Sequence, residues 1–286
     1  MGTVRRDPYS TRIVITGMGT INPIGNNIKE FYDNLIKGKS GVRITEHSDV
    51  PEDFCSRICG EVDIPDVSEY IHKKMIRRLG RYIVFAQVAA GQAFKDSGIT
   101  KQMVEKNPYR YGAIIGTGDG GLDMHIKQLP RILNDGPESS SPFYVVGEIP
   151  NTGSSYFAKL HGMKGPNFSV NSACASSNHA IGTAVMQIKM GMADVMFAGG
   201  SEAVANIIGF ASFGVIQALS QRNDDPETAS RPFDKDRDGF ILAEGAGVLC
   251  LEELEHAKKR GAKIYAELTG YGFTCDAYDL VAPHPE

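Results

Sequence analysis

A cysteine stands where two predicted elements meet. Cys174 follows a strand-like run at residues 167–173 and precedes helical spacing at residues 176–191. Just before a helix, free N–H groups and the positive end of the helix dipole stabilise a thiolate. The small neighbours Ala173, Ala175 and Ser176 allow a tight turn that projects a nucleophile from the backbone. The segment therefore indicates thiol nucleophilic chemistry at Cys174, whose backbone N–H is also a candidate oxyanion donor.

Two alternatives stay open on this segment alone. A lone cysteine between a strand and a helix is more often a small buried residue than a nucleophile. His179 is the nearest candidate base, but five residues along a helix place it roughly 140° around the axis from Cys174. We therefore interpret His179 as a core or supporting residue. A cysteine hydrolase is disfavoured, because only His179, His256 and His284 follow Cys174 and a triad needs an acid and a histidine in order.

The elements that must hold this turn are predicted from the spacing of apolar residues. Strands are predicted at residues 11–17, 111–116, 167–173, 194–198 and 263–272. Helices are predicted at residues 27–37, 75–97, 176–191 and 252–260. Residues 239–251 are typical of two strands joined or bent through glycines, and a hairpin there would add antiparallel strands. Alternating strands and helices indicate an α/β protein with a largely parallel sheet covered on both faces.

Composition narrows the function classes. The 286-residue chain carries a net charge of -4, so we expect neither nucleic acid nor an anionic membrane as a partner. It has no secretory leader pattern and no apolar run of membrane length, which predicts a cytoplasmic protein. Five irregularly spaced cysteines fit a reducing compartment. Cys55 and Cys59 lack a second pair of metal ligands, so we expect no metal site.

Residues 170–182 resemble the active-site turn of the β-ketoacyl-acyl-carrier-protein synthases, in particular the type II elongating enzymes. Further similar segments follow in the same order and spacing from about residue 12 to the end, at residues 14–19, 22–25, 116–118, 141–143, 165–167, 194–202, 222–224, 229–234 and 238–247. The family fold is thiolase-like, a duplicated α/β/α/β/α arrangement. The resemblance implies a first half at residues 1–261, with a mixed five-stranded sheet covered by helices on both faces. Residues 262–286 would then open a second half that is largely absent.

The resemblance also implies a two-step reaction without a cofactor or metal. Cys174 would accept an acyl group from acyl carrier protein as a thioester. A malonyl-carrier thioester would then lose carbon dioxide and attack that thioester. The family takes two histidines, a lysine and a Gly-Phe-Gly loop for this second step from the second half of its fold. We therefore expect an acyltransferase that is a homodimer when complete, and no condensing activity from this chain alone.

A basic helix is implied as the docking site for the carrier protein. Lys74, Arg77 and Arg78 match family positions that contact the acidic carrier, although a merely solvated helix face is the alternative. Glu138 and Gln217 stand where type II enzymes often have basic residues. The docking patch is therefore expected to be weaker or differently placed than in those enzymes.

Asp119 stands where the family places an apolar or small residue at the gate of the acyl pocket. A carboxylate there would shorten the accepted acyl group, favour a polar one, or point into solvent. Two other functions remain as alternatives. One is a thiolase-like or priming enzyme that uses coenzyme A thioesters. The other is a partner subunit that shapes an acyl pocket without condensing, which Cys174 disfavours because such subunits lack the nucleophile.

Overall fold

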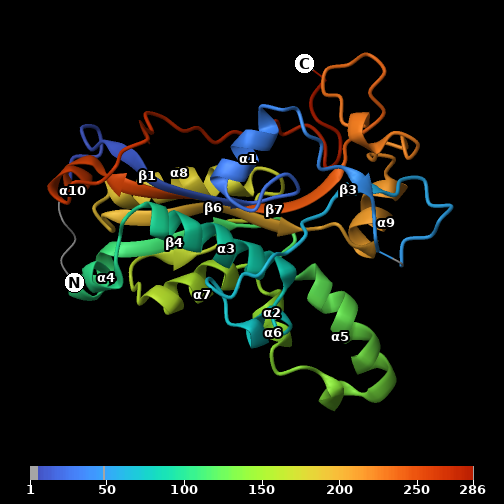
Figure 1. The fold of residues 1–286 in the computed structure, drawn as a ribbon, viewed down its shortest axis with the longest axis horizontal. Coiled ribbons are helices and arrows are strands. Elements are labelled where there is room, and N and C mark those ends of the chain that lie inside the picture. The colour runs from blue at the N-terminus through green and yellow to red at the C-terminus, as the bar shows by residue number, and fades with distance from the viewer. Residues whose placement is uncertain (1–5, 48, 286) are drawn as a thin grey trace.

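A mixed β-sheet crosses the molecule, and helices cover both of its faces (Figure 1). The computed structural model describes residues 6–47 and 49–285. Five strands lie side by side in the order β1 (Ile13–Ile21), β7 (Leu242–Glu253), β6 (Val195–Ala203), β4 (Tyr111–Gly116) and β5 (Asn167–Phe168). Short strands extend it, with β8 (Ala266–Glu267) on β1, and β3 (Ile58–Gly60) and β2 (Arg43–Ile44) beside the start of β7. The predicted mixed sheet covered by helices is confirmed, and three short strands join its five main ones to make eight among the described residues.

Strand direction divides the sheet into two parts. β7 pairs antiparallel with both β1 and β6, whereas β4 pairs parallel with both β6 and β5. The carboxyl ends of β4, β5 and β6 therefore meet at one edge, where α/β proteins commonly place their sites. The loops that follow β4 and β5 and the last residues of β6 can consequently contact one another.

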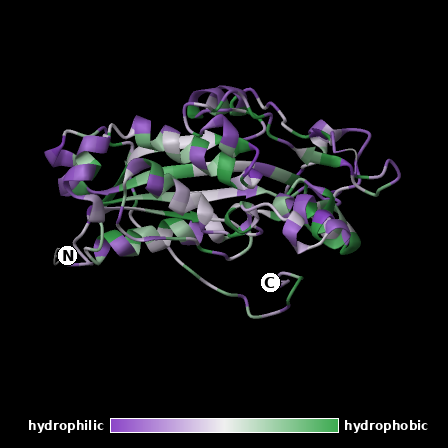
Figure 2. Ribbon diagram, turned by 90° about the horizontal axis from the view of Figure 1, so that it is seen from below, coloured by the Kyte–Doolittle hydropathy of each residue, from purple (hydrophilic) through white to green (hydrophobic). Residues whose placement is uncertain are grey.

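Two helices cover one face of the sheet. α3 (Arg81–Asp96) lies across β1, β7 and β6, and α7 (Thr152–His161) packs beside it. The largest fully buried side chains between these helices and the sheet include Tyr82, Phe85, Phe157 and Phe197. Hydrophobic residues lie along the strands and hydrophilic ones on the outer helical turns (Figure 2). This apolar layer anchors the sheet.

A single long helix covers the opposite face. α8 (Ser176–Lys189) buries Ala180, Ala184, Val185 and Ile188 against residues of β4, β6 and β7. The chain beyond β8 runs as a coil along this helix, where the Phe273 ring lies 4.7 Å from that of His179. Because α8 begins just after Cys174, its packing fixes where the cysteine lies relative to the sheet.

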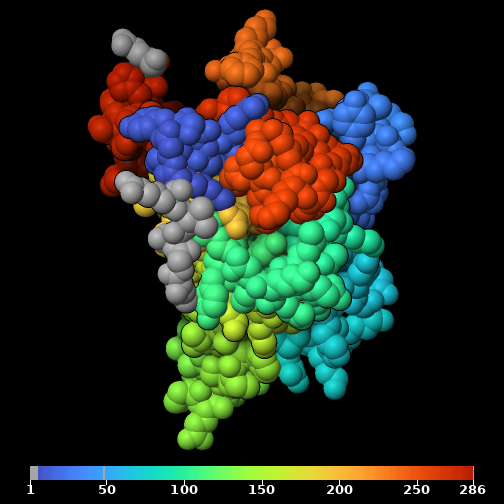
Figure 3. Space-filling view, turned by 90° about the vertical axis from the view of Figure 1, so that its left-hand side faces the viewer, coloured from blue at the N-terminus to red at the C-terminus, as the bar shows by residue number. Residues whose placement is uncertain are grey.

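The remaining helices lie around the sheet. They are α1 (Ile28–Leu35), α2 (Lys73–Ile76), α4 (Lys101–Lys106), α5 (Leu122–Asp135), α6 (Tyr144–Glu148), α9 (Ile207–Val215) and α10 (Leu254–Lys259). Short 3-10 turns occur at Pro108–Arg110, Pro137–Ser139 and Pro226–Thr228. α5 extends away from the sheet (Figure 1), and α10 lies against residues near the N-terminus (Figure 3). Among the described residues, no helix has both the length and the apolar composition to cross a membrane.

Four element predictions were wrong in detail. The helix predicted at residues 75–97 is two helices, because a Cβ on Gly80 would lie 2.4 Å from the Gly147 carbonyl oxygen and the chain is extended there. The two strands predicted at residues 239–251, joined or bent through glycines, are one strand: Gly245, at φ +147°, lies within β7 without reversing it. The strands predicted at 167–173 and 263–272 shorten to β5 and β8, each two residues long.

His161 at the end of α7 makes stability depend on pH. Its ring lies 4.0 Å from that of Phe94 and 4.6 Å from that of Phe157, and its buried Nδ1 has no hydrogen-bond partner. Burial, helped by the charge of Lys101, lowers the pKa of His161 to about 4 from 6.5. The unfolded chain therefore binds this proton more readily, and folding stability falls as pH drops from 6.5 towards 4.

The variant His161→Leu is expected to remove this dependence. Between pH 7 and pH 5 the native chain should lose about 1 kcal/mol more of its free energy of unfolding than the variant, after allowance for partial exposure of the ring. Urea unfolding at both pH values measures the difference. Parallel losses in the two proteins would contradict the assignment.

Candidate functional site

Cys174 lies on an exposed turn between β5 and α8, at the edge where the parallel strands end. The preceding residue, Ala173, has φ +48°, a left-handed conformation that is uncommon for a residue with a side chain. α8 starts at Ser176, two residues after the cysteine. The predicted strand-turn-helix arrangement therefore presents the thiol to solvent near a helix N-terminus.

Hydrogen bonds hold this turn in its strained shape. The buried Ser176 hydroxyl accepts from the Ser172 N–H at 2.8 Å and donates towards the Ala173 carbonyl oxygen at 2.7 Å. The Ala175 N–H also donates to the Ser172 carbonyl oxygen at 3.0 Å. Ser176, which follows Cys174, thus bonds two residues that precede it and closes the turn. The role of the Cys174 N–H as an oxyanion donor stays a prediction.

The loop after β4 lies against this turn. The Asn171 amide donates to the Gly118 carbonyl oxygen at 2.6 Å, and the Ser176 hydroxyl lies 3.3 Å from the Thr117 carbonyl oxygen. A Cβ built on Gly118 would lie 3.8 Å from the Ala173 Cα. Residues 117–121 and the cysteine turn therefore form one structural unit.

Glu202, near the end of β6, holds the loop at residues 117–119 through hydrogen bonds. Its carboxylate accepts the Gly118 N–H at 2.6 Å, the Asp119 N–H at 3.3 Å and the Thr117 hydroxyl at 3.2 Å. Burial raises the pKa of Glu202, and the negative charge of Asp119 raises it further, although the backbone N–H of Gly118 opposes the shift. Sequence reasoning included Glu202 only within the similar segment at residues 194–202, because its contacts with the loop join residues 85 positions apart in the chain.

The other residues predicted for the site lie around this unit. Asp119 is exposed on the loop that contacts the cysteine turn, and its role as a gate stays a prediction. His179, on α8, is half-buried and packs against Phe273, as expected for a supporting residue. The structure therefore brings Asp119 and Cys174 to the same edge of the sheet.

The basic residues predicted for docking lie on α2 and the turn after it. Lys74, Arg77 and Arg78 are all exposed, and the Arg78 guanidinium stacks over the Phe143 ring at 4.8 Å from the ring centre. Glu138 and Gln217 are also exposed. Lys74 and Arg77 are therefore better placed than Arg78 to contact a partner.

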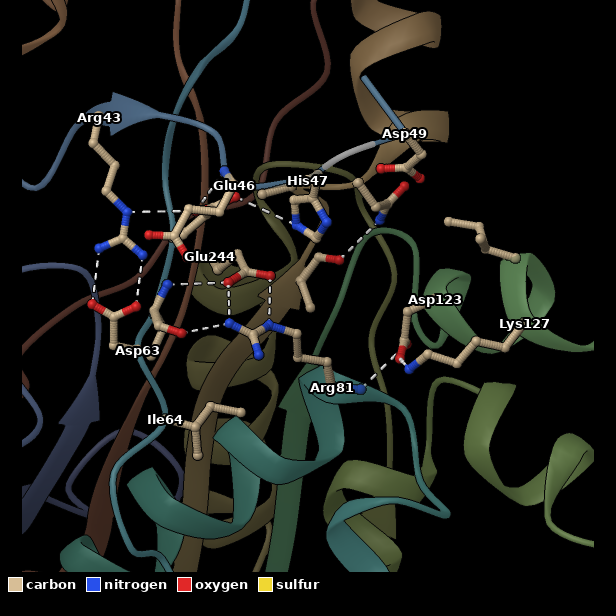
Figure 4. A pocket seen from close by; sticks show the side chains of 16 residues that line it. Arg43, Glu46, His47, Asp49, Asp63, Ile64, Arg81, Asp123, Lys127 and Glu244 are labelled. Atoms are coloured by element: carbon tan, nitrogen blue, oxygen red, sulfur yellow. Dashed lines mark hydrogen bonds and ion pairs between the residues drawn. The ribbon is translucent and has the colours of Figure 1, made fainter. Parts of the chain in front are cut away.

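Sequence reasoning missed a polar pocket of about 500 Å³ beside α5 (Figure 4). Charged side chains from distant segments line it, and most of them already form ion pairs: Arg43 with Asp63, Arg81 with Glu244, and Lys127 with Asp123. None of its lining residues belongs to the cysteine turn or to residues 117–121. These ion pairs connect the segments that line the pocket, and we assign the pocket no chemistry.

Metal chemistry has no evident site in the described part of the chain. No group of three or more His, Cys, Asp or Glu side chains there could hold a metal ion. Cys59 is buried and Cys55 is exposed. Burial, followed by the charge of Glu61, raises the pKa of Cys59 to about 12, so this thiol stays protonated.

Comparisons with known proteins agree with this geometry. The family model described as "Beta-ketoacyl synthase, N-terminal domain" matches residues 10–257. The 3-oxoacyl-[acyl-carrier-protein] synthase 2 of Vibrio harveyi is 43% identical over 272 residues, covering 95% of this chain and 65% of the relative. Its counterpart from Synechocystis sp. is 43% identical over 275 residues, covering 96% of this chain and 65% of the relative. The chain thus spans about two thirds of the length of these relatives.

Solved structures give the same result. A β-ketoacyl synthase from Burkholderia phymatum superposes with a TM-score of 0.85 at 32% identity, covering 96% of this chain and 66% of that one. The ketosynthase complex AntDE:AntF, solved as a type II polyketide acyl-carrier protein bound to its ketosynthase, has a TM-score of 0.82 at 33% identity. It covers 94% of this chain and 64% of its own.

Proposed function

The chain belongs to the β-ketoacyl synthase family, and we propose that it carries the acyl-accepting part of a 3-oxoacyl-acyl-carrier-protein synthase of type II fatty-acid synthesis. The observation that carries this proposal is the exposed Cys174 on its strained turn between β5 and α8. Relatives named 3-oxoacyl-[acyl-carrier-protein] synthase 2 support the choice of substrate class. The acyl donor is an acyl-carrier thioester.

The proposed chemistry is a thioester exchange. The Cys174 thiolate attacks the carbonyl carbon of the acyl-carrier thioester, and a tetrahedral intermediate forms. The Cys174 N–H would donate to the oxyanion of that intermediate. The intermediate collapses by breaking the bond to the carrier thiol, which leaves as a thiolate and takes up the proton that Cys174 lost. The acyl group then remains on Cys174 as a thioester, which is reactive enough to pass it on.

The condensation step is proposed for the longer protein. A malonyl-carrier thioester would lose carbon dioxide there, and its carbanion would attack the acyl-Cys174 carbonyl. We assign residues 1–261 to the unit that carries the cysteine turn and residues 262–286 to the opening of a second unit. The match to the N-terminal domain model, which ends at residue 257, supports a boundary near residue 261. This chain alone should accept an acyl group without condensing it.

Mass spectrometry tests the acyl-accepting step directly. Incubating the chain with an acyl-carrier thioester should add the mass of one acyl group, and digestion should place it on the peptide that contains Cys174. Hydroxylamine should release it, as expected of a thioester. An acyl group found on Cys55 or Cys275, or no adduct, would refute the proposal.

Docking of the carrier is proposed on α2. Reversing the charge of Lys74 and Arg77 to glutamate should raise the carrier concentration for half-maximal acylation about five-fold or more at low salt. The saturated rate should stay unchanged, because neither residue contacts the cysteine turn. A matched variant with Lys258 and Lys259 of α10 reversed, at the opposite end of the sheet, should behave like the native chain. An equal effect of both variants would indicate only a general charge effect.

We also propose that the complete protein is a cytoplasmic homodimer. β5 supports the dimer, because in the described part of the chain it pairs only with β4 and leaves its other edge open. Phe168 on this strand is 37% exposed. An open edge strand offers backbone donors and acceptors to a second copy across a two-fold axis.

A further inference from the structure

The proposed reaction does not use Glu202, although this half-buried carboxylate lies at the edge of the sheet where Cys174 lies. One of its oxygens accepts the Gly118 N–H and the Asp119 N–H, and the other accepts the Thr117 hydroxyl and the Ala203 N–H. No ion pair of Glu202 occurs within residues 6–47 and 49–285. A half-buried carboxylate that is held by backbone and hydroxyl donors, without a cation, loses part of its hydration at a free-energy cost. This cost indicates that its contacts have a structural role.

These contacts lead to the cysteine turn in two short steps. Glu202 holds Thr117 and Gly118, and the carbonyl oxygens of these residues then face the turn: that of Gly118 accepts the Asn171 amide at 2.6 Å, and that of Thr117 lies 3.3 Å from the Ser176 hydroxyl. Asn171 and Ser176 lie on opposite sides of Cys174 along the chain. The loop therefore clamps the turn from both ends.

We propose that Glu202 is a positioning residue for Cys174, which keeps residues 117–119 against the cysteine turn and so holds Ala173 in its left-handed conformation. The importance of this for catalysis rests on the proposed function. The positioning itself does not, because it concerns the accessibility and orientation of a thiol that any small electrophile can report.

The chemistry of a carboxylate explains why glutamate stands at this position. Ionised, it is acceptor-only, and both oxygens face donors here. Glutamine has one accepting oxygen, and its NH₂ group would face either the Gly118 N–H or the Ala203 N–H. Glu202→Gln keeps the size of the side chain, but its NH₂ group would point at one of these backbone N–H groups, so that two donors face each other. The loop should therefore move away from the turn.

The five cysteines provide the test within one molecule. Native chain and Glu202→Gln are treated with iodoacetamide, and the alkylation rates of Cys174, Cys55 and Cys275, which are all exposed, are followed by peptide mass spectrometry. In the variant, Cys174 alkylation relative to Cys55 and Cys275 should fall about ten-fold, since a displacement of about 1 Å is enough to impair a positioned group. Hydrogen exchange of residues 117–119 should accelerate, while β4 and β6 keep their protection.

Glu252→Gln is the matched control, because Glu252 is a hydrogen-bonded carboxylate on the same sheet, more deeply buried than Glu202, and contacts Arg260 and His256 at the opposite end. It should lower stability without changing the Cys174 ratio. An unchanged ratio in Glu202→Gln overturns the inference.

If the buried Cys59 and Cys250 become reactive in Glu202→Gln, that variant has lost its fold, and Glu202→Asp tests the inference in its place. The shorter carboxylate should give an intermediate ratio, and a native ratio overturns the inference. Failure to accept an acyl group would leave all these readouts intact.

Discussion

Replacing Cys174 with serine is expected to lower covalent acylation by an acyl-carrier thioester by about 10³-fold or more. A serine hydroxyl is almost fully protonated at neutral pH, and its turn contains no side chain that acts as a base: Ser176 is engaged in closing the turn, and His179 packs against Phe273. The measurement is the growth of the acylated intact mass with time.

The other exposed cysteines are the controls for this experiment. Cys55→Ser and Cys275→Ser remove exposed thiols outside the turn, so acylation should proceed at the native rate in both. Circular dichroism would establish that Cys174→Ser keeps its fold, as expected for an exposed position. Persisting acylation of Cys174→Ser would place the acyl group elsewhere and end the assignment of Cys174 as nucleophile.

Local features of the sequence were sufficient for the cysteine turn. β4 was predicted with its observed bounds, Tyr111–Gly116, because a short apolar run ends there in glycine. The start of α8 at Ser176 was also predicted, since helical spacing begins there directly after small residues. Strand, turn and helix in this order determine that Cys174 is presented at the edge of the sheet. Local reasoning therefore placed Cys174 on a turn before a helix, and the resemblance to the family then singled it out as the candidate nucleophile.

Contacts between distant residues determined what the sequence did not reveal. The break between α2 and α3 at Gly80 depends on the Gly147 carbonyl oxygen, 67 positions away and invisible in the local helical spacing. Residues 239–251 were interpreted as two strands because glycines commonly mark turns, whereas here pairing with β1 and β6 on its two edges keeps β7 continuous. Secondary structure that depends on neighbouring strands cannot be derived from the spacing of apolar residues.

The same reason explains the parts of the site that were missed. Glu202 reaches the loop at residues 117–119 only because β4 and β6 are parallel neighbours in register, with Gly116 beside Gly200. The charged pocket joins residues from position 43 to position 244. By contrast, Asp119 lies in a glycine loop that is recognisable in the sequence, and the family resemblance singled it out there. Single residues next to a recognisable turn could be predicted, and the network that supports them could not.

The buried acid Glu252 carries the second large expected effect. Its side chain is fully buried at the end of β7 and receives hydrogen bonds from Arg260, with Nε and Nη2 each at 2.7 Å, while the His256 Nδ1 lies 2.5 Å away. Burial alone would raise the pKa of Glu252, but the hydrogen bonds and charge of Arg260, with the hydrogen bond of His256, bring it below its usual value. This ion pair therefore stabilises the fold above pH 4.5, and the contribution is lost as pH falls through the lower folded pKa.

Arg260→Met should consequently lower the free energy of unfolding by about 3 to 5 kcal/mol at pH 7, because it leaves a buried carboxylate without its main partner. Urea unfolding measures the loss. Arg12→Met is the matched control, because it breaks the ion pair between Arg12 and Glu267, whose side chains are exposed by 59% and 30% respectively. This variant should lower the free energy of unfolding by less than about 1 kcal/mol.

The double variant Glu252→Gln with Arg260→Met separates charge from packing. It removes the stranded charge, so it should regain most of the stability lost in Arg260→Met. With Arg260 absent, burial dominates and the pKa of Glu252 should rise. Arg260→Met should then become more stable relative to the native chain as pH falls from 7 to 5, because its carboxylate takes up the proton that the native ion pair excludes. A constant difference between the two proteins over that range would mean that Arg260 acts by packing alone.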